Sequence, residues 1–168
     1  MVEEFTKKLE EITASEEYKG FAKEHSDHHL AHGFAQLDKN GNETKGWQIG
    51  FYSPSQDNIA TFTTNPVKFQ GFEKAFKEDD ATISELTETE RFIETERAIE
   101  NVKEHIKENH PKERIQTIIV VVQVIDDRQT YNITAVTESF TMIICKINAL
   151  TGKFISTDKR SVLDLKQE

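Results

Sequence analysis

The feature of this sequence that most constrains its fold is a change in hydrophobic period that occurs twice. Residues 2–25 place their apolar side chains at helical spacing, whereas from Leu30 onward apolar and polar residues alternate with the period of two that is typical of strands. A helical region at residues 73–108 and further strands from Ile115 onward repeat the same order. The sequence therefore predicts an α+β protein in which helices pack on antiparallel sheet.

The two halves of the chain also correspond in position. Trp47 opens the second strand of the first half and Tyr131 opens the second strand of the second half, and half the length of the chain separates them. The same interval separates Ile59 from Ile143. Sequence identity between the halves is very low, so the order of elements is what repeats.

This repeat predicts a tandem architecture with two identifiable local features. We expect two units, residues 1–72 and 73–168, each built from a helix and antiparallel strands, and packed together because units of this size are marginally stable alone. Ser15 is expected to break the first helical region and to cap a second, shorter helix. Residues 38–43 resemble the start of a calcium loop but lack its bidentate glutamate, so a hairpin turn is the expectation.

Charge and composition exclude several functional classes. The chain has a formal net charge of −9, and residues 73–108 hold twice as many acidic as basic side chains. This argues against a nucleic-acid partner, because phosphate binding depends on lysine and arginine. The longest apolar run, residues 118–122, is far shorter than the roughly 20 residues that span a bilayer. A single cysteine, Cys145, excludes a disulfide framework and a cysteine-based zinc site.

The expected location follows from the N-terminus and the cysteine. The first residues contain no apolar segment of the kind found in signal peptides. Cys145 within an apolar strand suits a reducing compartment. A cytoplasmic location is the expectation, unless a leader peptide was removed from the chain.

The most unusual local feature is a cluster that holds four of the six histidines, His25, His28, His29 and His32. On a helix, His25 with His29 and His28 with His32 would form two pairs, each able to bind a divalent metal. On a strand, His28, Leu30 and His32 would share a face, and of the four histidines only His28 and His32 could converge. The alternative is a polar connection whose imidazoles are solvated or hydrogen-bonded. Such a cluster also predicts a pH-sensitive patch.

Catalytic sequence patterns are absent. The chain has no nucleophile elbow, no Walker loop, no dinucleotide-binding glycine motif and no zinc-protease motif. Asp126 and Asp127 form a carboxylate pair, but a solvated turn does not raise a pKa as general acid catalysis requires. The sequence therefore predicts a protein that is not an enzyme and that needs no cofactor.

Residues 148–155 carry a recognisable turn, Asn-Ala-Leu-Thr-Gly-Lys-Phe-Ile, after a strand of alternating apolar residues. This segment resembles the final turn of PepSY domains, with Asn148 in place of their aspartate, and Trp47 stands where that family often has a tryptophan. In the first half, Asn65-Pro66 replaces the Thr-Gly turn. The resemblance implies a small cystatin-like module, found in propeptides of secreted proteases and in cell-envelope proteins, that binds or inhibits.

Three functions follow as expectations. The first is a non-enzymatic binding or inhibitory module that acts through contacts with a partner protein, by way of an exposed aromatic or edge-strand patch. The alternative is a metal or small-ligand binding protein that uses the histidine cluster or a cavity between helix and sheet. The third, a cystatin-like enzyme, requires a deep cone with a buried polar pair.

Overall fold

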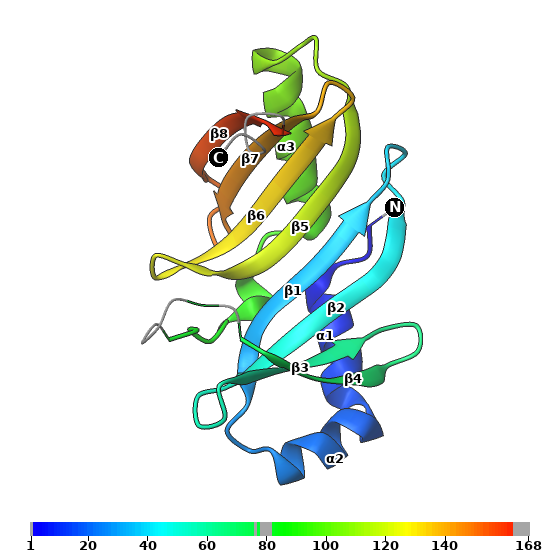
Figure 1. The fold of residues 1–168 in the computed structure, drawn as a ribbon, viewed down its shortest axis with the longest axis vertical. Coiled ribbons are helices and arrows are strands. Elements are labelled where there is room, and N and C mark those ends of the chain that lie inside the picture. The colour runs from blue at the N-terminus through cyan, green and yellow to red at the C-terminus, as the bar shows by residue number, and fades with distance from the viewer. Residues whose placement is uncertain (1, 76, 78–81, 163–168) are drawn as a thin grey trace.

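The computed structural model describes residues 2–75, 77 and 82–162, and within them it contains three α-helices, a short 3-10 turn and eight strands. In chain order they are α1 (Phe5–Ala14), α2 (Glu16–Glu24), β1 (His29–Leu37), β2 (Glu43–Ser53), β3 (Asn58–Thr63), β4 (Lys68–Lys74), η1 (Thr89–Arg91), α3 (Thr95–Asn109), β5 (Ile115–Ile125), β6 (Arg128–Thr137), β7 (Thr141–Asn148) and β8 (Phe154–Ser161) (Figure 1). None of the described helices is long and apolar enough to cross a membrane.

The described strands form one antiparallel sheet in the order β4-β3-β2-β1-β5-β6-β7-β8. Each half of the chain supplies four neighbouring strands, and the two sets meet where β1 pairs with β5, from His32 opposite Gln123 to Leu37 opposite Ile118. The predicted α+β class and the antiparallel sheet are therefore confirmed.

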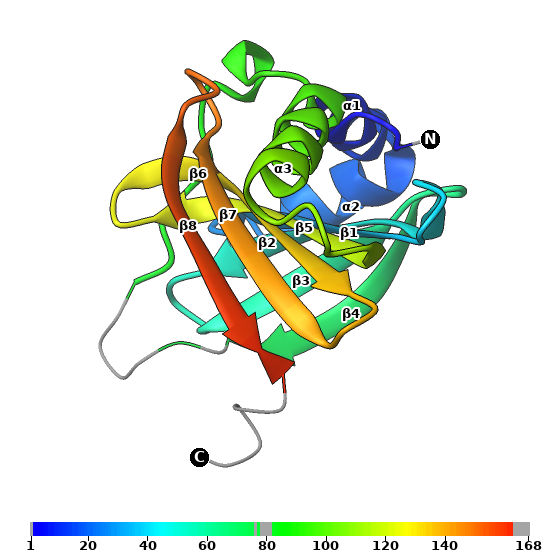
Figure 2. The ribbon, with the colours of Figure 1, turned by 90° about the horizontal axis from the view of Figure 1, so that it is seen from above.

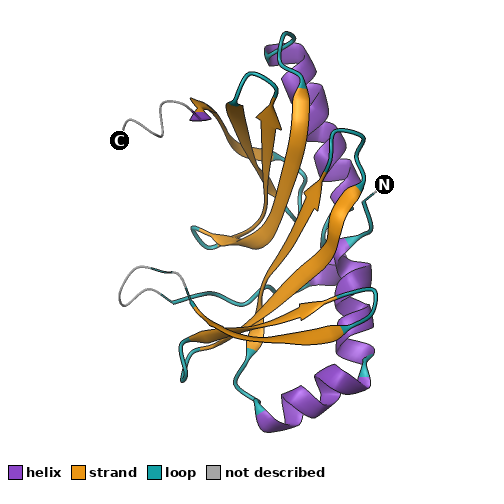
Figure 3. Cartoon of the chain, turned by 45° about the vertical axis from the view of Figure 1, so that its right-hand side comes forward, coloured by secondary structure: helices purple, strands orange, loops and turns teal. Residues whose placement is uncertain are grey.

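The described helices lie on one face of this sheet, and none of them covers the other face (Figures 2 and 3). Alternation along β1 explains why: Gly33, Ala35 and Leu37 are buried toward the helices, whereas Phe34 on the opposite face is half-buried. We call this second face the open face.

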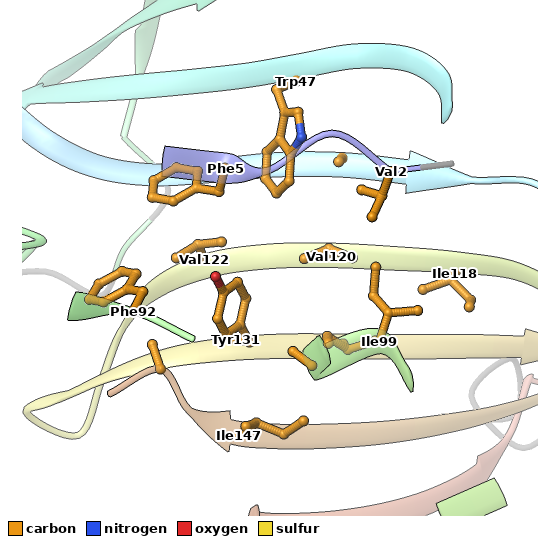
Figure 4. Packing of buried hydrophobic residues seen from close by; sticks show 14 of the residues in the cluster. Val2, Phe5, Trp47, Phe92, Ile99, Ile118, Val120, Val122, Tyr131 and Ile147 are labelled. Carbon is orange, nitrogen blue, oxygen red and sulfur yellow. The ribbon is translucent and has the colours of Figure 1, made fainter. Parts of the chain in front are cut away.

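One hydrophobic core lies between the helices and the sheet, and it draws on both halves of the chain. Phe5 of α1 contacts Trp47 at a ring-centroid distance of 5.5 Å and Phe92 at 6.4 Å, and Phe92 contacts Tyr131 at 6.3 Å (Figure 4). The polar atoms of the two large rings are satisfied. The Trp47 indole donates to the Glu3 carbonyl at 2.8 Å, and the Tyr131 hydroxyl donates to a backbone carbonyl.

Two local predictions are confirmed. Ser15 separates α1 from α2, and its hydroxyl accepts a hydrogen bond from the Tyr18 amide at 3.1 Å, which caps α2. The segment after β1 is a hairpin turn in which the Asp38 carboxylate accepts hydrogen bonds from the amides of Asn40 and Asn42. Gly41 in this turn has a φ of 80°, a conformation that glycine adopts without strain.

The helical region expected at residues 73–108 is largely wrong. Glu73 belongs to β4, and among the described residues the helix begins only at Thr95. The described residues from 82 to 88 run without regular secondary structure, because tertiary contacts take up their few apolar side chains: Leu86 is buried and its amide donates to the Leu30 carbonyl at 2.9 Å. Residues 76 and 78–81 lie outside the described residues.

Candidate functional site

The open face is hollowed into a cleft of about 790 Å³ at the place where β1 meets β5, which we call the open-face cleft. Its floor comes from β1, β2, β3 and β5. One wall is the end of β4 with residues 82–84, and the opposite wall is the turn between β5 and β6. Strands from both halves of the chain therefore build the site.

The floor contains two neighbouring rows of side chains. In the first row, His32 lies opposite Gln123 on β5 and opposite Gly50 on β2, and Gly50 in turn lies opposite Thr61 on β3. This row offers an imidazole, an amide and a hydroxyl. In the second row, Phe34 lies opposite Val121 on β5 and opposite Gln48 on β2, so a short apolar strip of two side chains lies beside the polar row.

Two irregularities of the strands position the His32 ring. The register between β1 and β2 shifts between Leu30 and His32, which leaves Ala31 as the extra residue of a β-bulge. Bulges redirect the side chains that follow them. Gly50 then leaves the space that the ring fills, since a Cβ at this position would overlap the ring of His32.

His32 is the titratable group of the floor. Burial lowers its pKa below the ordinary value, and the nearby carboxylate of Glu73 only partly opposes this effect. Among the described residues the ring has no hydrogen-bond partner. A neutral imidazole carries one donor and one acceptor, and His32 brings both functions to the lining of the cleft.

The rim of the cleft is acidic. Asp126 and Asp127 form the tip of the turn between β5 and β6, with φ values of 50° and 63°, and both are exposed as predicted. Glu73 stands on the wall formed by β4, next to Lys74, the basic residue of the described lining. Within the described part of the chain, none of these three carboxylates has an ion-pair partner.

The structure separates the four histidines that the sequence grouped. His25 and His28 lie together, with ring centroids 5.5 Å apart, near Phe21. His29 instead contacts the Ile83 carbonyl through Nε2 at 2.9 Å, and His32 lies in the cleft. Across the described residues, no three side chains of His, Cys, Asp or Glu are grouped as a metal site requires. Metal binding by this cluster stays a prediction.

A serine, a histidine and an aspartate also meet beside this cluster, but not in the order of a hydrolase triad. The Asp27 carboxylate accepts hydrogen bonds from the hydroxyls of Ser53, at 2.7 Å, and Ser55, and these bonds lower its pKa to about 2. The Nε2 atom of His28 contacts Asn58 at 3.0 Å. Because the imidazole contacts neither hydroxyl, it is not placed to activate one as a nucleophile.

Cys145 is not placed for chemistry either. It is buried on the helix-covered side of β7, and burial raises the pKa of its thiol to about 11. A thiol rather than a thiolate is therefore present at neutral pH, as expected for a structural cysteine.

Sequence reasoning missed the residues of the cleft apart from His32 and the turn aspartates. Gln123 and Val121 were placed in a strand, but nothing in their spacing indicates that β5 pairs with β1. Gly50 was a usable signal, because a glycine within a strand marks a bulge or a close approach.

Comparison with known proteins supports the fold and assigns no family. The chain is similar to a crystal structure described as a putative lipoprotein from Clostridium difficile 630, with a TM-score of 0.55 and 12% sequence identity over 84% of this chain and 89% of that chain. At this identity the likeness concerns the fold alone. No protein-family model matches the chain, and no curated protein matches it. The resemblance to PepSY domains stays a hypothesis from the sequence.

Proposed function

We propose that the protein is a non-enzymatic binding module that holds a small organic ligand in the open-face cleft. The observation that carries this proposal is the cleft itself. Its volume of about 790 Å³ falls within the range of small-molecule sites. Its floor places two apolar side chains, Phe34 and Val121, beside several polar ones. The expected cavity between helix and sheet is replaced in this proposal by one on the opposite face.

The two rows of the floor suggest how a ligand is held. Its apolar part rests on Phe34 and Val121, and burial of that surface supplies the affinity. Its polar groups meet His32 and Gln123, which orient it. Because His32 is neutral, a ligand that covers it does not have to remove water from a charged imidazolium.

A substitution that fills the cleft tests this proposal. Val121→Trp places an indole in the cleft, and Ile119→Trp adds the same group on the same face of β5 but outside the described lining. In an NMR screen of a fragment library, we expect hits on the wild type to shift the amide signals of the floor residues. These hits should vanish in Val121→Trp and persist in Ile119→Trp. Hits that survive Val121→Trp unchanged would contradict the proposal.

Contact with a partner protein is the second candidate function, favoured by three exposed phenylalanines. Phe72 on β4, Phe140 in the turn after β6 and Phe154 on β8 are 43%, 61% and 41% exposed. Aromatic side chains are enriched at protein–protein interfaces relative to the rest of the surface. A photo-crosslinking residue in place of Phe140 should give discrete adducts in host cells, whereas one in place of Glu104 on α3 should not.

The outer strands of the sheet are protected, so we expect a partner protein to contact a face of the sheet and not to add a strand at its edge. The amide of Phe69 on β4, an outer strand, donates to the carboxylate of Glu17 at 2.9 Å, which covers that edge. On β8, Asp158, Lys159 and Arg160 make the opposite edge charged. Both are protections against strand addition.

The tandem architecture is part of the proposal. We infer that the expected units, residues 1–72 and 73–168, are related, with the boundary moved past the end of β4 at Lys74. In each half, helix precedes four strands that run outward in sequence order from the centre of the sheet. The antiparallel pairing of β1 with β5 is what a local two-fold axis between such units would produce.

The compartment is likewise proposed. The similar Clostridium structure is described as a putative lipoprotein, which favours a place outside the cytoplasm over the cytoplasmic location expected from the sequence. Fractionation of host cells that express the native gene decides between the two. Recovery with the cytoplasmic fraction would contradict this assignment and leave the cleft proposal untouched.

A further inference from the structure

We propose that the ligand of the open-face cleft is a small organic cation, an ammonium or guanidinium group attached to an apolar body. This inference rests on the proposed function and adds the chemical class of the ligand. It is carried by the combination of an apolar strip on the floor with carboxylates on two sides of the rim that have no ion-pair partner among the described residues.

The charges around the cleft are complementary to a cation. Asp126 and Asp127 stand on one wall and Glu73 on the other, and within the described residues only Lys74 of the lining offsets them. A carboxylate without an ion-pair partner retains its field for a ligand, and a cleft lined by one sign of charge raises the local concentration of ligands of opposite charge. An anionic ligand would meet repulsion from both sides.

This acidity belongs to the cleft and is not simply the average of an acidic protein. A second cavity of about 380 Å³, on the helix-covered side near the C-terminal end of α3, has the opposite balance. Lys39, Lys103 and Lys107 line it together with two acidic residues. The second cavity therefore lacks the acidic rim that the open-face cleft has.

The floor accommodates the rest of such a ligand. Phe34 and Val121 contact its apolar body, and the unprotonated nitrogen of His32 accepts a hydrogen bond from an ammonium or guanidinium donor. Because burial keeps His32 neutral, the floor adds no positive charge that would repel the ligand. Floor and rim therefore favour the same class of ligand.

Three probes with the same phenyl body and different end groups test this inference on the full chain: 2-phenylethylamine, 2-phenylethanol and 3-phenylpropionate. Titrations followed by amide NMR signals give each dissociation constant. We expect the amine to bind about tenfold more tightly than the propionate, with the alcohol between them. Added salt should weaken amine binding and leave the alcohol unchanged.

A pair of double variants with equal charge change locates the effect. Asp126→Asn with Asp127→Asn should bring the affinity for the amine close to that of the alcohol. Glu104→Gln with Glu108→Gln removes two exposed carboxylates from α3 on the other side of the sheet and should leave it unchanged. A nitrogen-proton spectrum of each variant shows that the fold is retained.

The possible failures are distinguishable. Equal binding of all three probes at the floor residues would overturn the cation inference and leave the cleft as a ligand site. Equal loss of amine affinity in the two double variants would also overturn it, because the effect would then follow net charge. Shifts confined to residues outside the cleft would contradict the proposed function itself.

Discussion

At the scale of single residues, glycines decide how closely the layers of this molecule approach. Gly33 of β1 faces the helices, and a Cβ there would overlap the ring of Phe5 and lie 3.3 Å from the Trp47 ring. Gly50 makes the equivalent space for His32 on the open face. Gly20 in α2 has no heavy atom within 4 Å of the place of its missing Cβ, so the structure there does not require glycine.

Substitution of two of these glycines by alanine should have opposite effects. Gly33→Ala is expected to destabilise the protein by about 1–3 kcal/mol, because the buried rings must move. Gly20→Ala is expected to stabilise it by about 0.5–1 kcal/mol, because alanine favours a helix. Urea unfolding of both variants measures the two free energies. A similar change in the free energy of unfolding of both variants would show that the contacts around Gly33 leave room for a methyl group.

Asp27 predicts a pH dependence of local structure. Its pKa of about 2 lies below the usual 3.8 because the hydroxyls of Ser53 and Ser55 stabilise the carboxylate. A lowered pKa means that this stabilisation is complete above about pH 4 and is lost as the pH falls toward 2. In Ser53→Ala with Ser55→Ala, the carboxyl titration followed by NMR should move up toward 3.8. An unchanged midpoint would show that the hydroxyls are not the cause.

At the scale of elements, the N-termini of two helices from different halves cap each other. The Glu4 carboxylate accepts hydrogen bonds from the Thr95 amide at 2.6 Å and the Glu96 amide at 3.2 Å, at the start of α3. In return, the Phe5 amide at the start of α1 donates to the Thr95 hydroxyl at 3.2 Å. Negative charge at a helix N-terminus is favourable, so this contact both stabilises α3 and orients it against α1.

Removal of that cap should be costly. Glu4→Ala is expected to destabilise the protein by about 1–2 kcal/mol, the usual cost of losing a helix cap. Glu10→Ala on the exposed side of α1 is the control and should change stability by less than about 0.5 kcal/mol. Thermal unfolding measures both. Equal effects would mean that the Glu4 contact contributes no more than an ordinary surface residue.

Hydrophobic periodicity predicted most elements and failed where tertiary contacts override it. The strands around Trp47 and Tyr131 were recognisable from alternation, and Ser15 from its capping chemistry. The spacing of Ile83 and Leu86 favours a helical region, yet in the structure both side chains pack against the sheet from an irregular segment. Two apolar residues three positions apart can lie on one turn of a helix or can contact the core separately from an irregular segment, and their spacing does not distinguish the two cases.

At the scale of the whole molecule, the two halves are joined by backbone pairing and by a shared core. β1 and β5 pair along six residues of each strand. Phe5, Trp47, Phe92 and Tyr131 belong to one cluster although they come from both halves. Because the core is shared, neither half has a complete hydrophobic core of its own.

Cleavage between the halves tests this joint. With a protease site inserted after Lys77, the two fragments should remain associated in gel filtration and unfold in one transition, because the sheet and the core both cross the boundary. The uncut variant is the control for the insertion. If the two fragments separated and each kept the nitrogen-proton NMR spectrum of a folded protein, the halves would not depend on a shared sheet and core.

The sequence by itself determined the class of fold, because the period of apolar residues specifies helix or strand locally. It also determined the acidic turn at Asp126 and the absence of known catalytic patterns. Only the tertiary structure decided that β1 pairs with β5 and that His32 meets Gln123 while His29 turns elsewhere. These are contacts between residues distant in the chain, and their register depends on how two sets of strands bury their apolar faces together, which no local pattern encodes.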